Sequence, residues 1–262
     1  MSKKHKCDMA VILEPKVSGV HAAKIIRSLG YDDSIIEEAV GFSRGIWILW
    51  NQSSCSVKII EKRDQFILIQ VSIPNKQPFL FIAIYANPRI EIRQTLWDDL
   101  RRLHASFEEP WLLAGDFNEI LTASEKRGGT PVNLSRCSEF SSVLDDSKLL
   151  DLGSCGSRFT WKGPKFSHLD RVFKRLDRAM ANTQWRLCYE EVVVKVLPRL
   201  YSDHSPLLIS LFNSSTDWTP RPFRLFPPSL EHPNFKQVLE ENWDSHSETS
   251  ANLSRLVPIL RD

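Results

Sequence analysis

Cysteine pairs are the first feature that the sequence lacks. Its 262 residues include five cysteines, and these are widely scattered: Cys7, Cys55, Cys137, Cys155 and Cys188. No two of them form a CxxC motif, so a zinc site is not expected, and an odd, scattered set is typical of reduced thiols rather than of a disulfide framework. We therefore expect all five side chains to act as small buried hydrophobic groups.

Long hydrophobic runs are also absent. No apolar stretch approaches the roughly 20 residues that cross a bilayer. The MAVIL stretch behind the basic start of the chain is too short for the hydrophobic region of a signal peptide. Ten glycines and fifteen prolines exclude a low-complexity chain, whereas 42% of the residues are hydrophobic and can form a sizeable core. These features predict a soluble intracellular protein with one large domain or two small ones.

A strong net charge is the third absence, because the formal charge is only +2. That value alone does not indicate a nucleic-acid-binding protein. Residues 158–178, however, contain seven Lys and Arg residues against two Asp residues. In this stretch the candidates for contact with a phosphate backbone are Arg158, Lys162, Lys165 and Arg171. The alternative interpretation is the solvated face of a hairpin and a helix.

The hydrophobic pattern predicts many strands and few helices. Strands are expected within residues 8–16, 45–50, 56–62, 64–73, 79–88, 111–118, 159–163, 192–198 and 205–212. Residues 168–181 predict a strand, a loop, and then a strand or short helix. Apolar residues at helical spacing predict helices over 20–30, 93–107 and 235–243, and a helix that leads into a short strand over 138–152.

The order of these elements favours an α+β fold. Strands and helices do not alternate strictly, so a doubly wound parallel sheet is not expected, and mixed sheets packed face to face with helices outside fit better. From about residue 213 the pattern changes, because residues 213–234 contain five prolines and no strong periodicity. We expect one domain over 6–212, then a linker and a helical tail over 213–262.

Ionisable and polar residues gather at the predicted strand ends. The residues that end an apolar strand or directly precede one are Glu14, Tyr85, Asn87, Asp116, Asn118, Asp203 and His204. Asp177 lies in a mixed apolar and basic stretch. Strand ends that face one edge of a sheet pair are where ligand sites assemble. Carboxylate oxygens suit Mg²⁺ or Mn²⁺, and a His paired with an Asp can act as an acid, a base or a phosphate donor. This set suits hydrolysis of a phosphodiester.

Each of these residues also has a simpler interpretation. Gly115-Asp116 is a common turn signal, and Asp203-His204 can form an ordinary turn. Glu14 can be a plain surface acid, and Tyr85 can be an amphipathic residue at a strand end. Asp177 can form a surface ion pair with a neighbouring arginine. The functional interpretation depends on the joint pattern and its order.

That order resembles a known family. GDFN at 115–118, LDR at 176–178 and SDH at 202–204, with a Glu ending an early strand, are similar to the endonuclease/exonuclease/phosphatase superfamily with its DNase I-like fold. The flanking stretches AVILEPKVSG, GFSRGIWILW, PWLLAGDFNEIL, EKRGG, SRFTWKG, RLDRAMANTQWR and LPRLYSDHSPLLISL resemble endonuclease domains of plant LINE-type (non-LTR) retrotransposons. The resemblance covers about residues 6–212. Residues 221–243 look like the connector that precedes a reverse transcriptase in such polyproteins.

The resemblance implies a four-layer α/β/β/α sandwich and a role for each site residue. Asp116 would orient or deprotonate the attacking water, and Asn118 would bind the scissile phosphate. Glu14 and Asp203 would bind or surround Mg²⁺ or Mn²⁺. His204 would contact the phosphate with Asp177 as its orienting partner, and Tyr85 would donate to a phosphate oxygen or the leaving group. The implied partner is DNA in the nucleus, with no membrane and no small-molecule cofactor. The oligomeric state is left open.

One part of the family pattern is not found. The family opens with a strand that ends in an Asn, in a stretch like WNxRG, whereas this sequence opens with MSKKHKCDMAVIL. We therefore expect the first strand and its amide to be lacking, as in a truncated copy. A missing strand leaves unpaired backbone groups on its neighbour and a gap in the core. Three functions stay open: a DNA endonuclease, a catalytically dead remnant that binds nucleic acid, and a phosphatase of the same superfamily.

Overall fold

The computed structural model describes residues 7–15, 17–37, 45–165, 170–212 and 235–244, together with Asn252 and Leu256. The chain falls into two units, residues 1–213 and 214–262, and each is described by itself. The sequence-predicted linker over 213–234 lies outside the described residues. In the second unit the predicted helix is confirmed as α6 (Phe235–Asn242).

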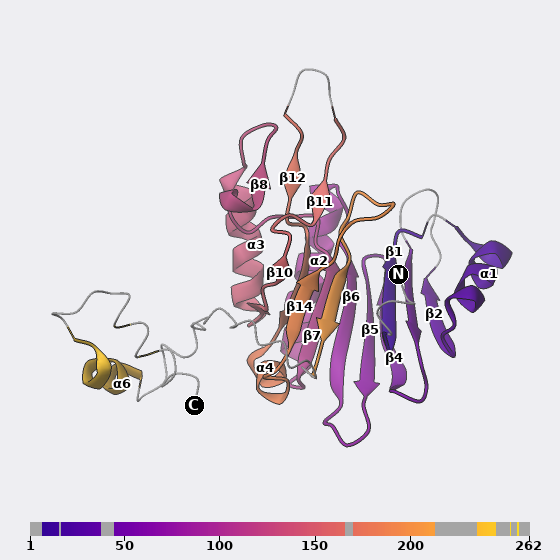
Figure 1. Ribbon diagram of the computed structural model, residues 1–262, viewed down its shortest axis with the longest axis horizontal. Helices are drawn as coiled ribbons and strands as arrows, with labels where there is room; N and C mark the ends of the chain where they lie inside the picture. The colour runs from indigo at the N-terminus through magenta and orange to yellow at the C-terminus, as the bar shows by residue number, and fades with distance from the viewer. Residues whose placement is uncertain are drawn as a thin grey trace. The chain divides into compact units, whose positions relative to one another are not determined.

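A six-stranded sheet forms the centre of the first unit (Figure 1). Its order is β4 (Ser56–Arg63), β5 (Phe66–Ser72), β6 (Phe79–Tyr85), β7 (Trp111–Asp116), β13 (Asp177–Ala181) and β9 (Leu150–Asp151). β6 and β7 pair in parallel, and the other neighbours pair antiparallel. The sheet is therefore mixed, as the order of predicted elements indicates.

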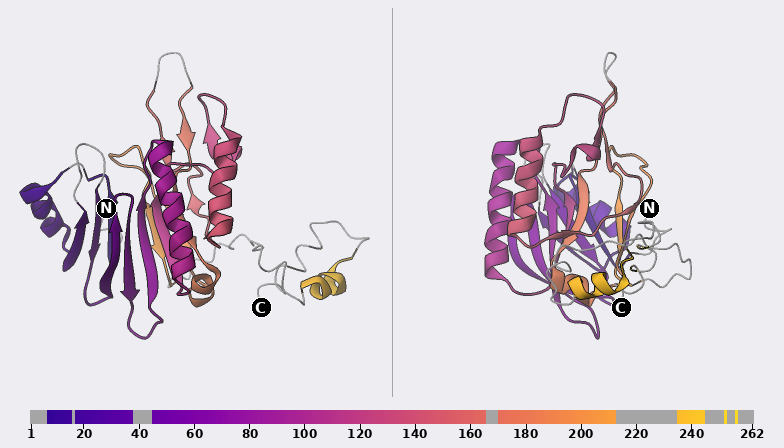
Figure 2. Two further views of the ribbon diagram at one scale, coloured as in Figure 1. Left: turned by 180° about the vertical axis from the view of Figure 1, so that it is seen from behind. Right: turned by 90° about the vertical axis from the view of Figure 1, so that its left-hand side faces the viewer.

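Three smaller sheets accompany it. One consists of β1 (Met9–Leu13), β3 (Ile46–Trp50) and β2 (Asp33–Glu37). A second consists of β10 (Cys155–Gly156), β14 (Val193–Val196) and β15 (Leu207–Ser210). The third contains β11 (Trp161–Lys162), β12 (Phe173–Lys174) and β8 (Lys126–Arg127). In both views β11 and β12 form a hairpin that projects beyond one end of the six-stranded sheet (Figures 1 and 2).

The first unit has four helices and one turn of 3₁₀ helix among its described residues: α1 (Gly19–Leu29), α2 (Ile90–Ser106), Ala123–Glu125 (3₁₀), α3 (Leu134–Asp146) and α4 (Thr183–Cys188). α1 ends at Gly30, whose φ of +77° is in the left-handed region that glycine adopts without strain. The amide oxygen of Asn133 caps α3 by accepting a hydrogen bond from the backbone N–H of Arg136.

Two hydrophobic clusters cover the two faces of the six-stranded sheet. One face packs on the small sheets, with Ile48 of β3, Ile69 of β5 and Val194 of β14 in one cluster. The other face packs on α2 and α3, which lie side by side on it (Figure 2). There Trp97 of α2 stacks on Phe140 of α3 with 4.8 Å between ring centroids. A third cluster joins α1 to the outer face of β3. The layers are thus helix, sheet, sheet and helix, so the predicted α+β sandwich is confirmed.

Most of the predicted elements are confirmed, but several short ones were missed: β2, α4, the 3₁₀ turn and the two-residue strands β8 and β10. β2, with the sequence DSIIE, is polar at both ends, and α4 is six residues long with one buried residue, Trp185. Both are too short to show a hydrophobic period. Within 170–181 the chain forms the strands β12 and β13, not a helix.

The cysteine prediction is only partly right. All five thiols are free, but Cys155 on β10 and Cys188 at the end of α4 are exposed. Cys155 lies on an edge strand of its sheet, and Cys188 is the last residue of a short helix. Among the described residues, no helix has the length and apolar character that a membrane span requires.

β1 and β15 are edge strands of their small sheets, because each has a pairing partner on one side only among the described residues. β1 pairs with β3, and β15 pairs with β14. Every residue of both strands is only half-buried, although Val11 and Ile209 pack against the same central cluster. An unpaired strand edge presents free backbone donors and acceptors. β1 and β15 are therefore edges where a further strand could add.

Candidate active site

Three of the predicted site residues lie in one row across the centre of the sheet. Tyr85 at the end of β6 is in register with Asp116 at the end of β7, and Asp116 is in register with Asp177 at the start of β13. Neighbouring strands are about 4.8 Å apart, and residues in register point to the same face. Tyr85 contributes to the cluster between the sheets, so the row faces the small sheets.

Gly115 allows this row to form. With a φ of +146°, it lies so close to β6 that an added Cβ would sit 1.9 Å from the carbonyl oxygen of Ile84. No side chain fits at that distance, so only glycine lets β7 approach β6 here. The glycine of the GDFN motif therefore has a packing role, in addition to the turn role that the sequence suggests.

His204 and Asp177 form a hydrogen-bonded pair. Nδ1 of His204 lies 2.9 Å from Oδ2 and 3.1 Å from Oδ1 of Asp177. The other ring nitrogen, Nε2, faces Asp116 at 3.9 Å from its Oδ2. Because Nδ1 is used by Asp177, the ring presents Nε2 toward Asp116. The pairing expected between Asp177 and His204 is present in the structure.

Asn118 holds the carboxylate of Asp116. Its backbone N–H donates to Oδ1 of Asp116 at 2.9 Å, and its amide nitrogen donates to Oδ2 at 3.0 Å and to the carbonyl of Ala86 at 2.8 Å. Its φ of +49° is in the left-handed region, which Asn tolerates better than most residues. Both amide hydrogens are thus engaged within the protein, and in this arrangement the side chain orients Asp116.

Glu14 reaches the site from the end of β1. Its carboxylate accepts a hydrogen bond from the hydroxyl of Tyr85. Its backbone, with a φ of +49°, is fixed by a bond from its N–H to the carbonyl of Gly45 at 3.0 Å. The structure therefore brings Glu14 to the row on the six-stranded sheet.

Asp203 is held at the margin of the site. The residue is exposed, and its Oδ2 accepts a hydrogen bond from Nε1 of Trp161 at 2.9 Å. Its carbonyl accepts from the backbone N–H of Lys162 at 2.9 Å. These bonds join the loop that carries His204 to the β11–β12 hairpin.

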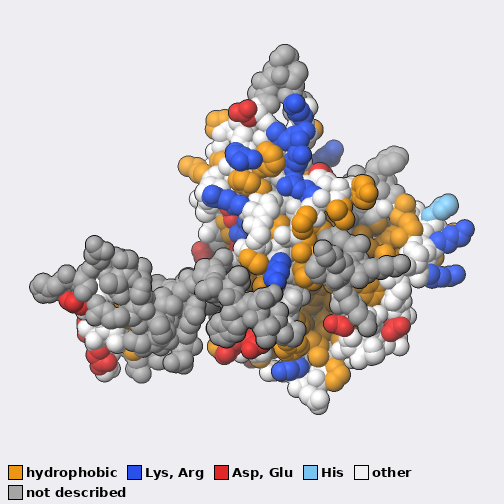
Figure 3. Space-filling view, viewed as in Figure 1, with side chains coloured by type: hydrophobic (Ala, Val, Ile, Leu, Met, Phe, Trp, Pro, Cys, Tyr) orange, Lys and Arg blue, Asp and Glu red, His pale blue; other side chains and the backbone are white. Residues whose placement is uncertain are grey.

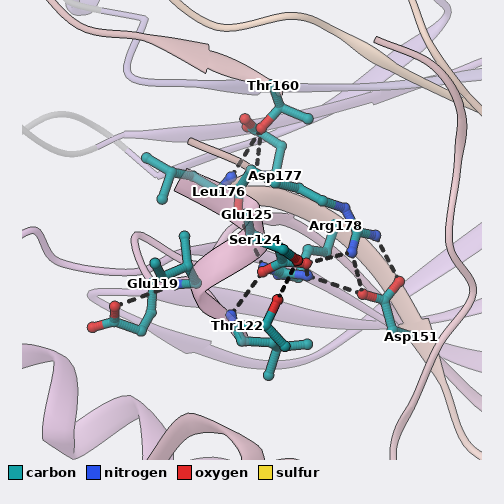
Figure 4. A network of polar contacts seen from close by, with 12 residues as sticks. Glu119, Thr122, Ser124, Glu125, Asp151, Thr160, Leu176, Asp177 and Arg178 are labelled. Atoms are coloured by element: carbon teal, nitrogen blue, oxygen red, sulfur yellow. Dashed lines mark hydrogen bonds and ion pairs between the residues drawn. The ribbon is translucent and has the colours of Figure 1, made fainter. Parts of the chain in front are cut away.

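Thr160 connects the two segments that carry the His204–Asp177 pair. The residue is fully buried. Its hydroxyl oxygen accepts hydrogen bonds from the backbone N–H groups of Leu176 and Asp177, both at 2.9 Å, and its carbonyl accepts from the N–H of Ser205 at 2.6 Å (Figure 4). One residue thus positions the neighbours of both members of the pair. The sequence reasoning missed it, although it lies in the quoted stretch SRFTWKG.

A buried ion network lies next to Asp177 on β13 (Figure 4). Arg178, which is fully buried, binds Glu125 and lies 3.0 Å from Asp151. Arg175 binds Glu125 at 2.9 Å and Asp151 at 2.7 Å. The simpler interpretation of Asp177, an ion pair with a neighbouring arginine, is therefore wrong, because both arginines pair with other acids.

A second charged cluster holds the loop after Asn118. Arg93 of α2 is fully buried and lies 2.6 Å from Oε2 of Glu119, which also binds Arg136 of α3 at 2.7 Å. Arg93 also donates to the carbonyl of Asn87 at 2.8 Å. Asn87 therefore supports the loop through its backbone, on the outer side of the site.

The two ionisable groups that face each other both have shifted pKa values. Burial raises the pKa of Asp116, and the negative charge of Asp177 raises it further, to about 7. Burial lowers the pKa of His204, but the hydrogen bond and charge of Asp177, together with Asp116 and Asp203, outweigh it and raise this pKa to about 9. Between these values the pair consists of a carboxylate and an imidazolium.

The ligand atoms of Asp116, Asp177 and His204 lie within 4.8 Å of one another and could hold a metal ion. Glu14 and Asp203, the two sequence-predicted metal ligands, are not in this group. Asp177 and Nδ1 of His204 are hydrogen-bonded to each other, whereas Asp116 faces the other ring nitrogen, Nε2. The donor set is rich in carboxylates, which fits a hard divalent cation better than zinc.

The predicted phosphate-contact residues lie on and near the projecting hairpin. Arg158, Lys162 and Lys165 are exposed, and Arg171 is half-buried. Arg127 lies over the rings of Phe159 and Phe173, at 5.4 and 4.5 Å from their centroids, which stiffens the base of the hairpin. Figure 3 shows Lys and Arg side chains gathered on this part of the surface.

Residues 20–204 match the Endonuclease/Exonuclease/phosphatase family. This is well over half of the chain, and the chain therefore belongs to that family. A search of curated protein sequences finds no match.

Three solved structures illustrate the fold that this chain shares. The endonuclease domain of TRAS1, a telomere-specific non-LTR retrotransposon, is 13% identical with a TM-score of 0.58 over 79% of this chain and 87% of its own. The 3′ phosphatase NExo from Neisseria, bound to a product DNA hairpin, is 15% identical with a TM-score of 0.57 over 80% and 90%. An AP endonuclease from Archaeoglobus fulgidus is 17% identical with a TM-score of 0.55 over 80% and 90%. At these identities the likeness shows the fold.

Proposed function

We propose that the chain is a divalent-metal-dependent phosphodiesterase of the kind that nicks target DNA for a LINE-type retrotransposon, and that its activity is impaired. The observation that carries the proposal is the row of Tyr85, Asp116 and Asp177 with His204 paired to Asp177. This arrangement places a carboxylate that can act as a base, Asp116, 3.9 Å from a histidine that can act as a charged donor, His204. That is the chemistry that hydrolysis of a phosphate ester requires.

Asp116 accepts the proton of the attacking water. Burial and the charge of Asp177 raise the pKa of Asp116 to about 7, so this carboxylate is basic enough to take a proton near neutral pH. Asn118 keeps its two oxygens in place through the hydrogen bonds from its backbone and amide nitrogens. We therefore assign Asn118 a positioning role; the phosphate contact predicted from the sequence would require its amide to give up one of its two hydrogen bonds.

His204 donates from Nε2 to a phosphate oxygen. With a pKa of about 9 it is protonated at neutral pH, and Asp177 fixes its orientation. A charged donor aimed at developing negative charge stabilises the transition state, because the donor is already oriented before the reaction. Tyr85, bound to Glu14, supplies a hydroxyl at the same edge.

The metal in this proposal is Mg²⁺ or Mn²⁺. Glu14 would hold it, with Asp203 nearby, because carboxylates at the edge of a polar site suit hard cations that keep several waters. When bound, such a cation stabilises negative charge on a phosphate oxygen. Oδ2 of Asp203 accepts a hydrogen bond from Trp161, so only its Oδ1 would be available to the metal while that bond is kept.

DNA is the proposed substrate, and the nucleus is the proposed location. The basic hairpin beside the site supports a polyanionic substrate, since exposed Arg158, Lys162 and Lys165 lie next to it. The fold of the TRAS1 endonuclease domain supports the retrotransposon assignment. The motifs of the sequence carry the finer assignment to a plant LINE-type element, with residues 213–262 as the connector to a reverse transcriptase.

The proposed impairment concerns the strand that the family places first. β1 and β15 each have a single neighbour among the described residues, and their residues are half-buried. A further strand would complete these edges and bring an amide to the site. The same observation favours a second candidate function, nucleic-acid binding without catalysis.

Nicking of supercoiled plasmid, with Mg²⁺ and with EDTA, tests the proposal. We expect slow or undetectable Mg²⁺-dependent nicking by the unmodified chain, and no nicking by Asp116→Asn. Asp145→Asn is the matched control, because Asp145 is exposed on α3. Nicking that survives in EDTA or in Asp116→Asn would refute the assigned chemistry. Fast Mg²⁺-dependent nicking by the unmodified chain would refute the impairment.

A further inference from the structure

The loop between β14 and β15 presents two large hydrophobic side chains to solvent beside His204. Tyr201 is 104% exposed and Leu200 is 65% exposed, so Tyr201 is the most exposed large hydrophobic residue in the described part of the chain. The loop lies at the same end of the sheets as the β11–β12 hairpin in both views (Figures 1 and 2). A single exposed Leu or Tyr is ordinary on a protein surface, but two adjacent ones at the mouth of a site invite an explanation.

The loop is fixed at its base. The backbone N–H of Leu197 donates to the carbonyl of Pro206 at 2.8 Å and closes it. Nη1 of Arg199 donates to the carbonyl of Asp203 at 3.4 Å, and the hydroxyl of Ser202 accepts from the N–H of His204 at 3.1 Å. Hydrogen bonds from the indole of Trp161 and from the backbone N–H of Lys162 hold Asp203 to the hairpin. Leu200 and Tyr201 are therefore exposed on a loop whose backbone is held by hydrogen bonds.

Tyr201 is close enough to His204 to touch the same substrate molecule. It precedes His204 by three residues, and three residues span at most about 10 to 11 Å between Cα atoms. Duplex DNA rises about 3.4 Å per base step along each strand. A phosphate that binds at His204 therefore places the neighbouring two or three bases within reach of Tyr201.

The chemistry around the pair indicates which part of the substrate it meets. Arg199 and exposed Lys162 supply positive charge near the loop and suit phosphates. The tip itself is aromatic and aliphatic, and suits the apolar faces of bases. Apolar wedges flanked by basic residues insert between base steps and kink a duplex. Aromatic side chains stack on bases that are already unpaired.

We propose that Tyr201, with Leu200 beside it, stacks on a base next to the scissile phosphate, so that the protein prefers DNA that is unpaired or kinked at the cut site over a regular duplex. The proposal rests on the proposed function, because it requires DNA at His204. It adds a specificity-determining residue outside the group that performs the chemistry.

Binding of two short DNA duplexes tests the inference. One is fully paired, and the other carries a single unpaired 2-aminopurine. Both are titrated with the full chain carrying Asp116→Asn, so that no cleavage occurs. Adding Tyr201→Ala is expected to weaken binding of the unpaired duplex by about 5- to 150-fold, which corresponds to ~1–3 kcal/mol per stacked base. Tyr201→Phe keeps the ring and is expected to bind as tightly as the parent, which is the chain with Asp116→Asn alone.

Two controls separate stacking from charge and from general surface effects. Leu187→Ala removes a leucine of nearly the same exposure, 66%, on α4 at the other end of the sheets, and is expected to change nothing, whereas Leu200→Ala weakens binding. Arg199→Ala is expected to lower the slope of log K against log salt by about 1, whereas Tyr201→Ala leaves that slope unchanged.

The outcomes divide cleanly. A 2-aminopurine signal that changes on binding of the parent and of Tyr201→Phe, but not of Tyr201→Ala, supports the inference. Equal affinity of the parent and Tyr201→Ala for both duplexes overturns it and leaves the proposed function standing. Failure of every chain to bind either duplex overturns the proposed DNA substrate, and the inference with it.

Discussion

Removal of the carboxylate of Asp177 should lower the pKa of His204. The substitution Asp177→Asn keeps the shape of the side chain but removes the charge that lies 2.9 Å from Nδ1. That pKa stands at about 9, against 6.5 for an unperturbed histidine, even though burial of the ring lowers it. An opposite charge at this distance accounts for about 1–3 pKa units, so the pKa should fall toward 6.5 or below.

The same shift has a consequence for folding stability. A His pKa that is raised by about 2.5 units in the folded state corresponds to roughly 3 kcal/mol. Because the folded-state pKa is the higher one, this stabilisation is complete below pH 6.5 and is lost as the pH rises to about 9. In Asp177→Asn, the free energy of unfolding should lack this loss between pH 6.5 and 9.

Two measurements check the prediction without any need for catalysis. Nitrogen-15 NMR of the imidazole follows the titration of His204 directly, and urea unfolding at pH 6 and pH 9 follows the stability. Asp145→Asn on the surface of α3 should leave both unchanged. An unaltered His204 pKa in Asp177→Asn would show that the carboxylate does not control this ring, and the assigned orientation of His204 would be wrong.

Three further predictions concern the same site. Thr160→Val leaves two buried N–H groups without an acceptor and should lower the free energy of urea unfolding by about 2–6 kcal/mol, at ~1–3 kcal/mol for each group. Thr160→Ser keeps the hydroxyl and should stay within about 1 kcal/mol of the unmodified chain. Equal losses in both variants would exclude the hydroxyl as the cause. Gly115→Ala places a Cβ against the backbone of β6 and should reduce the melting temperature strongly; a normal melting curve would contradict the close approach. In any variant that nicks DNA, the rate should rise with pH through about 7 as Asp116 ionises and fall above about 9 as His204 loses its proton; a flat profile across both values would contradict the acid and base roles.

The strands of the fold could be predicted because their hydrophobic runs are long enough to read. β5, β6 and β7 each contain at least four consecutive apolar residues, and their ends are marked by Gln65, Tyr85 and Gly115. β2 and α4 could not be predicted, because elements of five and six residues are too short to show a hydrophobic period. Their positions are set by pairing with β3 and by the burial of Trp185.

Part of the candidate site was predictable, including the contact between Asp177 and His204, but most of the other contacts were not. Strand-end positions and the family motifs brought together Asp116, Asp177 and His204. The row across β6, β7 and β13 depends on the register between strands that are distant in the sequence, which the pattern within one strand does not specify. The hydrogen bonds of Thr160 and the bond between Trp161 and Asp203 arise only when the hairpin folds against the loop. Exposure of Tyr201 could not be read from the sequence either, because the residue lies in a loop without a hydrophobic period.

The central claim is that Asp116 and His204 cleave a phosphodiester, and that a further strand beside β1 would speed the reaction. The most direct measurement compares plasmid nicking in Mg²⁺ by the unmodified chain and by a version that carries a family-type first strand and helix ahead of β1. Loss of one oriented donor can reduce a rate by about 10²- to 10³-fold. We predict nicking that is at least that much faster in the extended version and that disappears on Asp116→Asn. Equal rates in the two versions, or nicking by the extended version that persists in Asp116→Asn, would contradict the account.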